Sequence, residues 1–392
     1  MTETLIVGYA RTPFAKFLGQ LAQVPATELG GHAARAALEK AGVSSELVEQ
    51  VVVGQVLQGA AGQNPARQSA AAAGIGMDVP SLAVNGVCLS GSEAVVAGHR
   101  LIQLGEADVV VAIGQESMTL APHAARIRAG AKFGNAEMID TMQHDGLTDA
   151  FERQAMGAST EHFNDRHELT REEQDAFAAE SHQRLQRAQS EGVFDDEIAP
   201  IEVGRGRRAT TVSVDDGGRE GVTAESLGGL RPAFAAEGTI TAGNASQITD
   251  GAAAVVLVSD RFAAEHGLAA MARILSTSLV AGPDVSLHEQ PSNAIRVALE
   301  RAGRSTDELA AVEINEAFAA VGIVSTRALG VDPAIVNANG GAIALGHPIG
   351  ASGARIVGHL ARRLAALGAG SLGATGICGG GGQGTALVLE AV

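Results

Sequence analysis

Tryptophan is absent from the 392-residue chain, tyrosine occurs once, and aromatic residues make up only 3% of the sequence. Cysteine occurs twice, which excludes the disulfide framework of a small secreted protein. No apolar run approaches the roughly 20 residues that a membrane-spanning helix requires. The N-terminus also lacks the charged and apolar regions of a signal peptide. We therefore expect a reduced, soluble, cytoplasmic protein without a membrane partner.

Positive charge is also scarce. The net charge of −16 and the pI near 5.1 leave no broad basic field to offset phosphates, so no nucleic-acid partner is expected. In contrast, 46% of the residues are hydrophobic and 50 are glycine, enough for a large core packed from small side chains. The length predicts two or three domains.

The chain repeats itself. Segment 37-ALEKAGVSSELVEQVVV-53 aligns without gaps with 298-ALERAGRSTDELAAVEI-314, at an offset of 261 residues. Each copy predicts an amphipathic helix, a glycine stop, a second capped turn and a β-branched strand. Two later pairs of segments also correspond: 88-CLSGSEAVVAG-98 with 347-HPIGASGARIVG-358, and 104-LGEADVVVAIG-114 with 367-LGAGSLGATGI-377. The sequence therefore predicts two copies of one α/β unit.

A different segment separates the copies. It contains a charged helix predicted over 170–192, with a capping box formed by Thr170 and Glu173. A buried strand is predicted next, over 250–260. We predict an N-terminal half from 1–119 plus 246–270, an inserted loop domain over 120–245, and a C-terminal half over 271–392.

Cys88 is the first candidate for chemistry, because it lies at the start of a predicted helix, where unpaired N–H groups favour an anion. A cysteine with a pKa of about 8.5 is only about 3% thiolate at pH 7. The helix dipole contributes about 0.3–1 kcal/mol, less than one pKa unit. A reactive Cys88 therefore needs a partner base, and an inert buried cysteine is the alternative.

His347 is the candidate base. It stands at the matching helix start of the second copy, flanked by glycines and followed by proline. In a pseudo-twofold fold both helix starts face a shared crevice, where open α/β sheets bind ligands. A histidine that only caps a turn is the alternative.

Two further positions complete the candidate site. Cys378 precedes glycines 379–382, whose exposed N–H groups could form an anion nest or an oxyanion hole. A phosphate loop is disfavoured, because the run lacks G-x-x-x-x-G-K-[ST] and leads into a strand. Asn315 follows the repeated strand where the first copy has Gly54, which suggests a function in one half, although a helix cap is the alternative. No metal site is expected, since the cysteines form no C-x-x-C pair.

Together these motifs resemble those of the thiolases, the acetyl-CoA C-acetyltransferase family. The resemblance runs the whole length of the chain, through ARTPFAKFLGQL, NGVCLSGSEAV, GQESMTLAPH, DGLTDAF, RPAF, GTITAGNASQITDGAAAV, NEAFA, GGAIALGHPIGASGAR and CGGGGQG. It implies an α/β thiolase fold, with two pseudo-twofold related βαβαβαββ halves in an αβαβα layered core and an inserted loop domain.

The resemblance also implies roles for the candidate residues. Cys88 matches the nucleophile that carries the acyl group, and His347 matches the base that activates it. Cys378 matches the acid/base that moves the α-proton. Asn315 matches the residue that holds a water in one oxyanion hole, and the backbone N–H groups of Cys88 and Gly380 match the other hole.

The implied reaction is reversible cleavage of a 3-ketoacyl-CoA, or condensation of two acetyl-CoA molecules, through an acyl-cysteine intermediate. Coenzyme A and acetyl-CoA are then substrates, and no permanently bound cofactor is expected. Arg219, Ser226 and Ser246 match positions that contact CoA in relatives, with Arg207 and Arg208 as weaker candidates. A homo-oligomer, dimer or tetramer, is implied as well.

Acyl-chain length stays open. Leu89 stands where short-chain members usually have glycine, Gly86 replaces a longer polar residue, and Ala155 stands where biosynthetic members often have histidine. A longer-chain degradative thiolase and a non-catalytic CoA- or lipid-binding relative are therefore alternatives. A condensing enzyme of the β-ketoacyl synthase type generally has His or Asn in place of Cys378, and a nucleotide-binding oxidoreductase would need a fingerprint that this sequence lacks.

Overall fold

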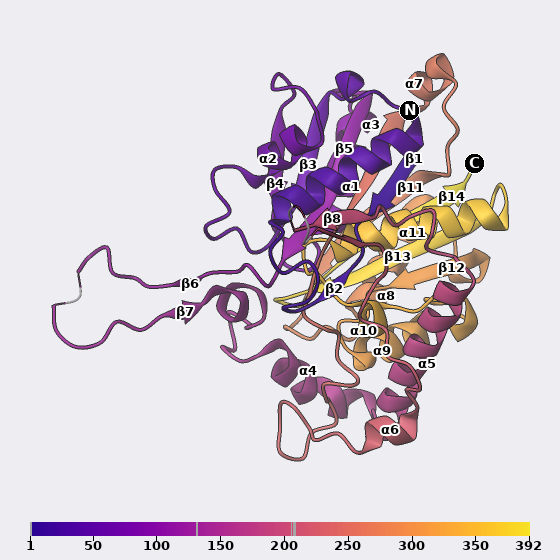
Figure 1. Cartoon of the computed structure of the whole chain (residues 1–392). Coiled ribbons are helices and arrows are strands. Elements are labelled where there is room, and N and C mark those ends of the chain that lie inside the picture. The colour runs from indigo at the N-terminus through magenta and orange to yellow at the C-terminus, as the bar shows by residue number, and fades with distance from the viewer. Residues whose placement is uncertain (1, 131, 205, 207–208) are drawn as a thin grey trace.

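A large mixed β-sheet dominates the computed structural model, which describes residues 2–130, 132–204, 206 and 209–392 (Figure 1). The strands of this sheet in the described residues are β1 (Thr4–Arg11), β2 (Ala15–Lys16), β3 (Gln50–Gly54), β4 (Ser81–Val84), β5 (Val109–Ser117), β10 (Thr249–Ser259), β11 (Ala272–Ala281), β12 (Leu309–Ile314), β13 (Leu372–Gly379) and β14 (Gln383–Ala391). Their order is β12-β13-β14-β11-β1-β10-β5-β3-β4, with β2 paired to β10.

The strand pairing repeats in the two halves of the chain. In the first half β3 runs parallel to β4 and β5, and β5 pairs antiparallel with β10. In the second half β12 runs parallel to β13, which pairs antiparallel with β14. The halves join through a short antiparallel contact between β1 and β11. The predicted buried strand over 250–260 is confirmed as β10, whose residues are all buried.

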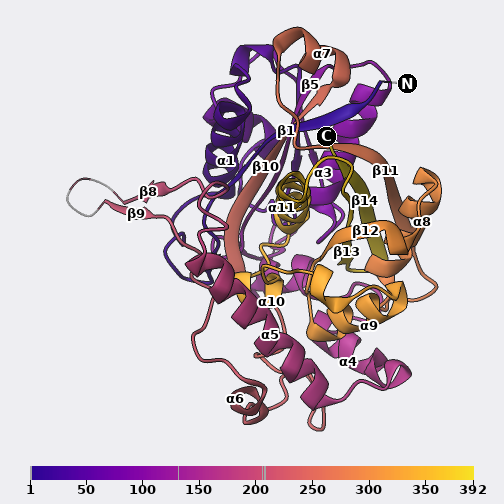
Figure 2. The same cartoon turned by 90° about the vertical axis from the view of Figure 1, so that its right-hand side faces the viewer.

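Helices cover both sides of each half-sheet. The helices packed on the strands are α1 (Ala26–Ala41), α2 (Pro65–Ala72), α3 (Ser90–Gln103), α7 (Asp260–His266), α8 (Gln290–Ala302) and α11 (Ser352–Leu367). In contrast, α9 (Ala319–Leu329) packs on α8 and on the inserted segment, and α10 (Ala342–Leu345) packs on the inserted segment. The apolar faces of α3 and α11 share one core cluster with strands from both halves, whereas α1 and α2 pack outside the first half and α8 outside the second. Figure 2 shows α3 and α11 in the middle, with α1 and α8 on opposite outer sides. This is the alternating αβαβα arrangement of the predicted thiolase fold.

The repeated segment has the predicted local structure in both copies. In each, a helix ends at a glycine in the left-handed conformation, Gly42 after α1 and Gly303 after α8. A serine then caps a single 3₁₀ turn, and β3 or β12 follows. Helix stop, capped turn and strand are therefore confirmed.

The segment between β5 and β10 contains α4 (Met156–Asn164), α5 (Arg171–Ser190), α6 (Ala224–Gly228) and the short hairpins β6 (His123–Ala124) with β7 (Ile139–Asp140) and β8 (Ile201–Val203) with β9 (Thr210–Val212). Figure 1 shows the β6–β7 hairpin projecting far from the body. The predicted helix over 170–192 is confirmed as α5, and Thr170 accepts the N–H of Glu173. The reciprocal half of the capping box is not formed, because Glu173 pairs with Arg327 instead. Within the described residues, no helix is both long and apolar enough to cross a membrane.

A buried ion network ties the inserted segment to the core. The guanidinium of Arg11 on β1 contacts Glu197 at 2.7 Å and both oxygens of Asp215 at 2.6 and 2.8 Å. Glu197 also accepts a 2.8 Å hydrogen bond from Nδ1 of His359 on α11. Because all these side chains are buried, removing one partner would leave an uncompensated charge.

The starts of α3 and α11 cross with no room for side chains. A Cβ on Gly353 would lie 2.2 Å from the amide nitrogen of Ser92, and a Cβ on Gly91 would lie 2.7 Å from that of Ala354. The small residues therefore allow the two backbones to touch. This contact sets the relative position of the two preceding turns, which carry Cys88 and His347.

Gly353→Ala is expected to destabilise the fold by about 1–3 kcal/mol through overpacking. Because the added methyl group pushes α11 from α3, acyl transfer activity is expected to fall as well. Thermal unfolding and steady-state activity measure the two effects. Gly228→Ala in α6 is the matched control, since its Cβ would meet no atom within 4 Å and its stability should be unchanged or higher. Equal behaviour of the two variants would contradict the crossing contact.

Candidate active site

Cys88 lies in a tight turn between β4 and α3. The side chain of Asn85 accepts the N–H of Val87 at 2.9 Å, and the hydroxyl of Ser90 accepts the N–H of Gly86 at 3.0 Å and donates to the carbonyl of Val87 at 2.6 Å. These bonds hold Val87 at φ 54°, a conformation that β-branched residues rarely adopt. Such stored strain clusters at functional sites, and here it precedes the thiol directly.

His347 lies in the corresponding turn before α11. Its backbone N–H donates to the carbonyl of Gln247 and to the hydroxyl of Thr249, both at 3.1 Å. Its Nδ1 lies 2.6 Å from the hydroxyl of Ser352, which itself donates to the carbonyl of Pro348 at 3.1 Å. Since that hydroxyl has one proton, it accepts from Nδ1–H of His347. The neutral tautomer with a free Nε2 is therefore favoured.

Ser352 was not among the residues singled out from the sequence. The only signal was its place five residues after His347, in the first turn of the predicted helix. Ser352→Ala is expected to lower kcat about tenfold, because loss of one hydrogen bond lets the imidazole change tautomer. The control is Ser92→Ala on α3, a buried serine whose hydroxyl has no partner among the described residues. Equal kcat in the two variants would contradict a role for Ser352 in fixing the tautomer.

Cys378 lies near the end of β13, buried beside the turn to β14. The path of this turn requires glycine. Gly382 has φ 68°, and a Cβ there would lie 1.9 Å from the carbonyl oxygen of Asp284. The backbone N–H groups of Cys88 itself and of Gly380 act to lower the pKa of the Cys88 thiol, so both are directed at its sulfur. A thiolate or an oxyanion at this position would therefore meet two backbone donors.

The two thiols and the imidazole are uncharged at neutral pH. Burial raises the pKa of Cys88 to about 12. The N–H of Cys88 itself opposes this shift, the charge of Glu116 adds a smaller upward effect, and the N–H of Gly380 opposes it least. Burial and then the proximity of Cys88 raise the pKa of Cys378. Burial, with a smaller effect of the Arg355 charge, lowers the pKa of His347 to about 3. The resting site is thus a neutral thiol with a neutral base, and a proton moves only when a substrate stabilises the new charge.

Asn315 follows β12 and reaches the imidazole. Its Nδ2 lies 3.5 Å from both ring nitrogens of His347, and its Oδ1 is buried with no hydrogen-bond partner among the described residues. A buried amide oxygen without a partner is a position where an ordered water can bind. The corresponding residue of the first copy is Gly54, so of these two positions only Asn315, beside His347, has a polar side chain.

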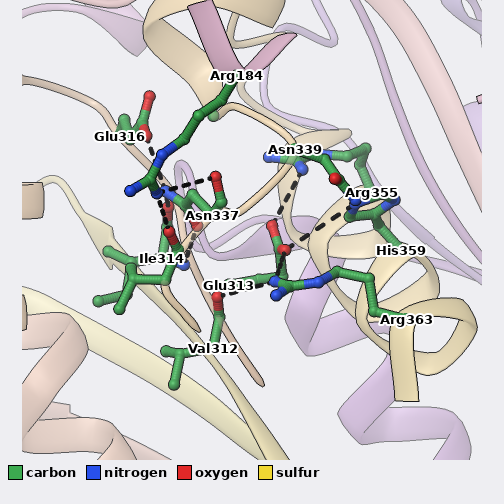
Figure 3. Close-up of polar contacts among 12 residues, drawn as sticks. Arg184, Val312, Glu313, Ile314, Glu316, Asn337, Asn339, Arg355, His359 and Arg363 are labelled. Atoms are coloured by element: carbon green, nitrogen blue, oxygen red, sulfur yellow. Dashed lines mark hydrogen bonds and ion pairs between the residues drawn. The ribbon is translucent and has the colours of Figure 1, made fainter. Parts of the chain in front are cut away.

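A polar network holds the backbone around Asn315. Asn337 bonds the N–H and carbonyl of Ile314 and donates to Glu316, all at 2.8 Å. Glu316 also accepts from the hydroxyl of Ser181 on α5 at 2.7 Å, so the inserted segment supports this strand end. Figure 3 shows Asn337 between Ile314 and Glu316.

The same view shows a second cluster beneath the strand, where Glu313 faces Arg363 at 2.5 Å and Arg355 at 3.5 Å (Figure 3). These ion pairs are buried. The cluster holds Arg355, the residue whose charge lowers the pKa of His347, in a fixed place.

An open cavity of about 370 Å³ adjoins the thiol turn, with Val87 and Gly380 on one side and the 144–151 segment and Met156 on the other. Leu89 does not line it: this side chain is buried, in a small core cluster with Ile356 and Ile377. Ala155 caps the start of α4, next to the cavity residue Met156.

The residues expected to contact CoA do not line this cavity. Arg219 and Ser226 are exposed on the inserted segment, and the hydroxyl of Ser226 is bonded to Thr223 in a capping box. Ser246 is half-buried, and its N–H donates to the carbonyl of Ala317. Ser246 directly precedes Gln247, whose carbonyl oxygen accepts the N–H of His347. The weaker candidates Arg207 and Arg208 lie outside the described residues.

The assembled groups suit acyl transfer. Cys88 supplies a nucleophile, His347 a neutral base, Cys378 a second thiol, and Asn315 and two N–H groups supply polar contacts for developing charge. Among the residues that the structure describes, no group of three His, Cys, Asp or Glu side chains could hold a metal ion. The fold brings Cys88 of the first copy close to Cys378 of the second, and it places Asn315 3.5 Å from the ring of His347.

Comparisons with known proteins agree with this description. The model of the thiolase N-terminal domain matches residues 4–261, and that of the thiolase C-terminal domain matches residues 268–391. A protein of Mycobacterium tuberculosis named probable acetyl-CoA acetyltransferase is 53% identical over 393 residues and is covered completely, as is this chain. The acetyl-CoA acetyltransferase of Paracoccus denitrificans is 46% identical, again with complete coverage of both chains.

A solved structure is similar over the same extent. The acetyl-CoA acetyltransferase of Bacillus anthracis superposes with a TM-score of 0.96 at 37% sequence identity. The match covers 100% of this chain and 99% of that one. Fold and domain content therefore correspond from end to end.

Proposed function

Because the chain belongs to the thiolase family and is an acyl-CoA C-acyltransferase, we propose that it cleaves acetoacetyl-CoA with coenzyme A and catalyses the reverse condensation of two acetyl-CoA molecules. The names of its relatives, acetyl-CoA acetyltransferases, support acetyl transfer as the main activity. The observation that carries the proposal is the proximity of the two thiols from the two halves of the chain, with two backbone donors at Cys88 and with the imidazole of His347 beside Asn315.

In the first half-reaction, the thiol of Cys88 loses its proton to Nε2 of His347 and its sulfur attacks the 3-keto carbon. The oxygen of the tetrahedral intermediate receives the N–H groups of Cys88 and Gly380. The C2–C3 bond then breaks, which leaves an acetyl group on Cys88 and the enolate of acetyl-CoA. Because the resting thiol and imidazole are neutral, the charge develops only within this donor-lined site.

The enolate needs a proton on carbon and support on oxygen. The thiol of Cys378 donates the proton, and its position close to Cys88 supports this role. Imidazole Nε2–H and a water held by the free Oδ1 of Asn315 support the enolate oxygen. In the second half-reaction the thiol of coenzyme A gives its proton to the Cys378 thiolate and its sulfur attacks the acetyl thioester. Cys88 leaves as a thiolate that takes back the proton of the imidazolium, and acetyl-CoA is released. Two products leave in separate steps, so the kinetics should be ping-pong.

A preference for acetoacetyl-CoA is supported by the place of Leu89. This residue departs from the short-chain pattern, but it packs into the core and leaves the cavity unchanged. The cavity beside Gly380 is nevertheless open, and its volume of about 370 Å³ makes a longer acyl chain the second candidate.

We propose that the segment over 120–245, with Arg219 and Ser226, and also Ser246, binds coenzyme A on the side of the crevice. We also propose a cytoplasmic location and a role in fatty acid metabolism. A homo-oligomer, dimer or tetramer, is supported by exposed apolar residues on two features: Met77 and Leu82 at the edge strand β4, and Ile127, Phe133 and Met138 in the hairpin.

The test compares thiolysis of acetoacetyl-CoA with that of a medium-chain 3-ketoacyl-CoA, each with coenzyme A, by loss of substrate absorbance. Higher kcat/KM for acetoacetyl-CoA is expected. A preference for the longer chain would replace the proposed substrate by the second candidate. No cleavage of either would contradict the thiolase reaction and favour a binding protein.

A further inference from the structure

Because the two halves are related by a pseudo-twofold axis, each catalytic thiol has an equivalent position in the other half. Gly91 and Gly353 meet where α3 crosses α11, so they are equivalent points. Three residues before them stand Cys88 and Gly350, and 25 residues after them stand Glu116 and Cys378. Glu116 on β5 pairs with Gly251, just as Cys378 on β13 pairs with Gly384. Glu116 therefore occupies in the first half the place that Cys378 occupies in the second.

Two equivalent sites follow from this relation, and only one contains thiols. At the proposed catalytic site Cys88 faces Cys378. At the equivalent site the N–H of Gly350 donates to Oε2 of Glu116 at 3.0 Å. At the equivalent site, a carboxylate therefore occupies the place that corresponds to the acyl group and its N–H donors at the proposed catalytic site.

Among the described residues, the hydrogen bonds to the carboxylate of Glu116 all come from backbone N–H groups. Oε2 accepts the N–H of Val56 at 3.0 Å as well as that of Gly350, and Oε1 accepts the N–H of Leu57 at 3.2 Å. Gly350 has no space for a side chain, because a Cβ would lie 2.8 Å from Oε2. The carboxylate therefore connects three segments by direct hydrogen bonds: β5, the loop after β3 and the turn before α11.

The tied segments surround the reactive groups. Gly350 belongs to the same turn as His347, three residues away. Cys88 packs against a cluster that contains Val56, Leu57 and Ile349. The carboxylate therefore links the wall behind the nucleophile to the turn that carries the base.

We propose that Glu116 is a positioning residue of the acyl-transfer site: its carboxylate fixes the His347 turn against the Cys88 side and places a buried negative charge beside the nucleophile. This inference deepens the proposed function and rests on it. The charge keeps the nucleophile protonated until a substrate is bound, since an anion beside a carboxylate is disfavoured.

The titration of these groups gives the sign of the effect. Burial, with a smaller effect from Asp250 on β10, raises the pKa of Glu116 to about 7, against the three N–H donors. The charge of Glu116 in turn raises the pKa of Cys88, which also faces Cys378 on β13. Above about pH 7 the charged carboxylate therefore makes the Cys88 thiolate harder to form. Removing that charge should shift thiolate formation to lower pH.

The experiment compares Glu116→Gln with wild type in two assays. The rate of Cys88 alkylation by iodoacetamide, followed on its peptide as a function of pH, is expected to shift to lower pH by about one unit. The kcat for acetoacetyl-CoA is expected to fall by about tenfold or more with little change in KM, because one N–H donor now faces an amide NH₂. An unchanged alkylation profile together with an unchanged kcat would overturn the proposal.

Glu161→Gln is the matched control. This carboxylate on α4 also accepts two backbone N–H groups, those of Thr239 and Ile240 at 2.8 and 2.7 Å. Loss of stability is expected there without a shift of the alkylation profile. If Glu116→Gln behaved in the same way, its role would be structural only, and the proposal would be wrong.

Glu116→Asp provides a second variant that keeps the charge but withdraws it from the three donors. A lower kcat with unchanged KM and a profile close to wild type supports the positioning role, whereas unchanged kcat contradicts it. This variant decides the matter even if Glu116→Gln does not fold. Alkylation of Cys88 requires no turnover. If the protein cleaved no 3-ketoacyl-CoA but the alkylation profile still shifted in Glu116→Gln, the proposed function would be wrong, whereas the effect of Glu116 on Cys88 would stand.

Discussion

Cys88→Ala is expected to abolish transfer of the acetyl group from acetyl-CoA to the protein and to lower turnover at least about 10⁴-fold. Cys88 combines the features of a nucleophile: it follows the strained Val87, and its own N–H and that of Gly380 reach the sulfur. Cys378 is buried, and burial together with the nearby Cys88 raises the pKa of its thiol. It should therefore not replace Cys88 as acyl acceptor. Incorporation of labelled acetyl groups, measured before turnover is complete, gives the result directly.

The fold of this variant should be retained, because the side chain of Cys88 is half-buried and alanine removes one atom from its packing. Thermal unfolding close to that of wild type is the control. Normal labelling of a folded Cys88→Ala protein would remove this residue from the role of nucleophile.

Cys378→Ala is expected to separate the two halves of the reaction. The variant keeps Cys88, His347 and the two N–H donors, so it should still accept one acetyl group from acetyl-CoA. It lacks the thiol that moves a proton to and from carbon. Cleavage and formation of the carbon–carbon bond should therefore fall by about 10²–10⁴-fold, the range for loss of general acid–base catalysis.

The measurement pairs acetyl labelling with thiolysis of acetoacetyl-CoA in the same preparation. Labelling with little thiolysis is the expected combination. Normal thiolysis would show that another group transfers the proton, and loss of labelling would show that Cys378 is needed to form or reach the acyl-enzyme.

Much of this molecule follows from local sequence patterns. The glycine stops at Gly42 and Gly303 and the capped turns after them need only nearby residues, so both repeats predict their own structure. The pattern at Cys88 and His347 is local as well, because each stands at a glycine-rich helix start. Their roles as nucleophile and base stay predictions.

Other parts of the site depend on contacts across the fold and carry no local signal. Glu116 and Gly350 are 234 residues apart, and their hydrogen bond exists only because α3 and α11 cross at Gly91 and Gly353. The burial of Asn315 Oδ1, and its lack of a hydrogen-bond partner among the described residues, likewise result from the packing of segments distant in sequence. The incomplete capping box at Thr170 has the same origin, since a distant arginine, Arg327, binds Glu173.

The central claim is that Cys88 carries the acyl group between two half-reactions. The most direct measurement is to incubate the wild-type protein with acetoacetyl-CoA alone, quench it, digest it and locate the acetyl group by mass spectrometry. One acetyl group on the peptide that contains Cys88, lost when coenzyme A is added before the quench, is the predicted result. An acetyl group on Cys378, or one on Cys88 that coenzyme A does not remove, would contradict the account.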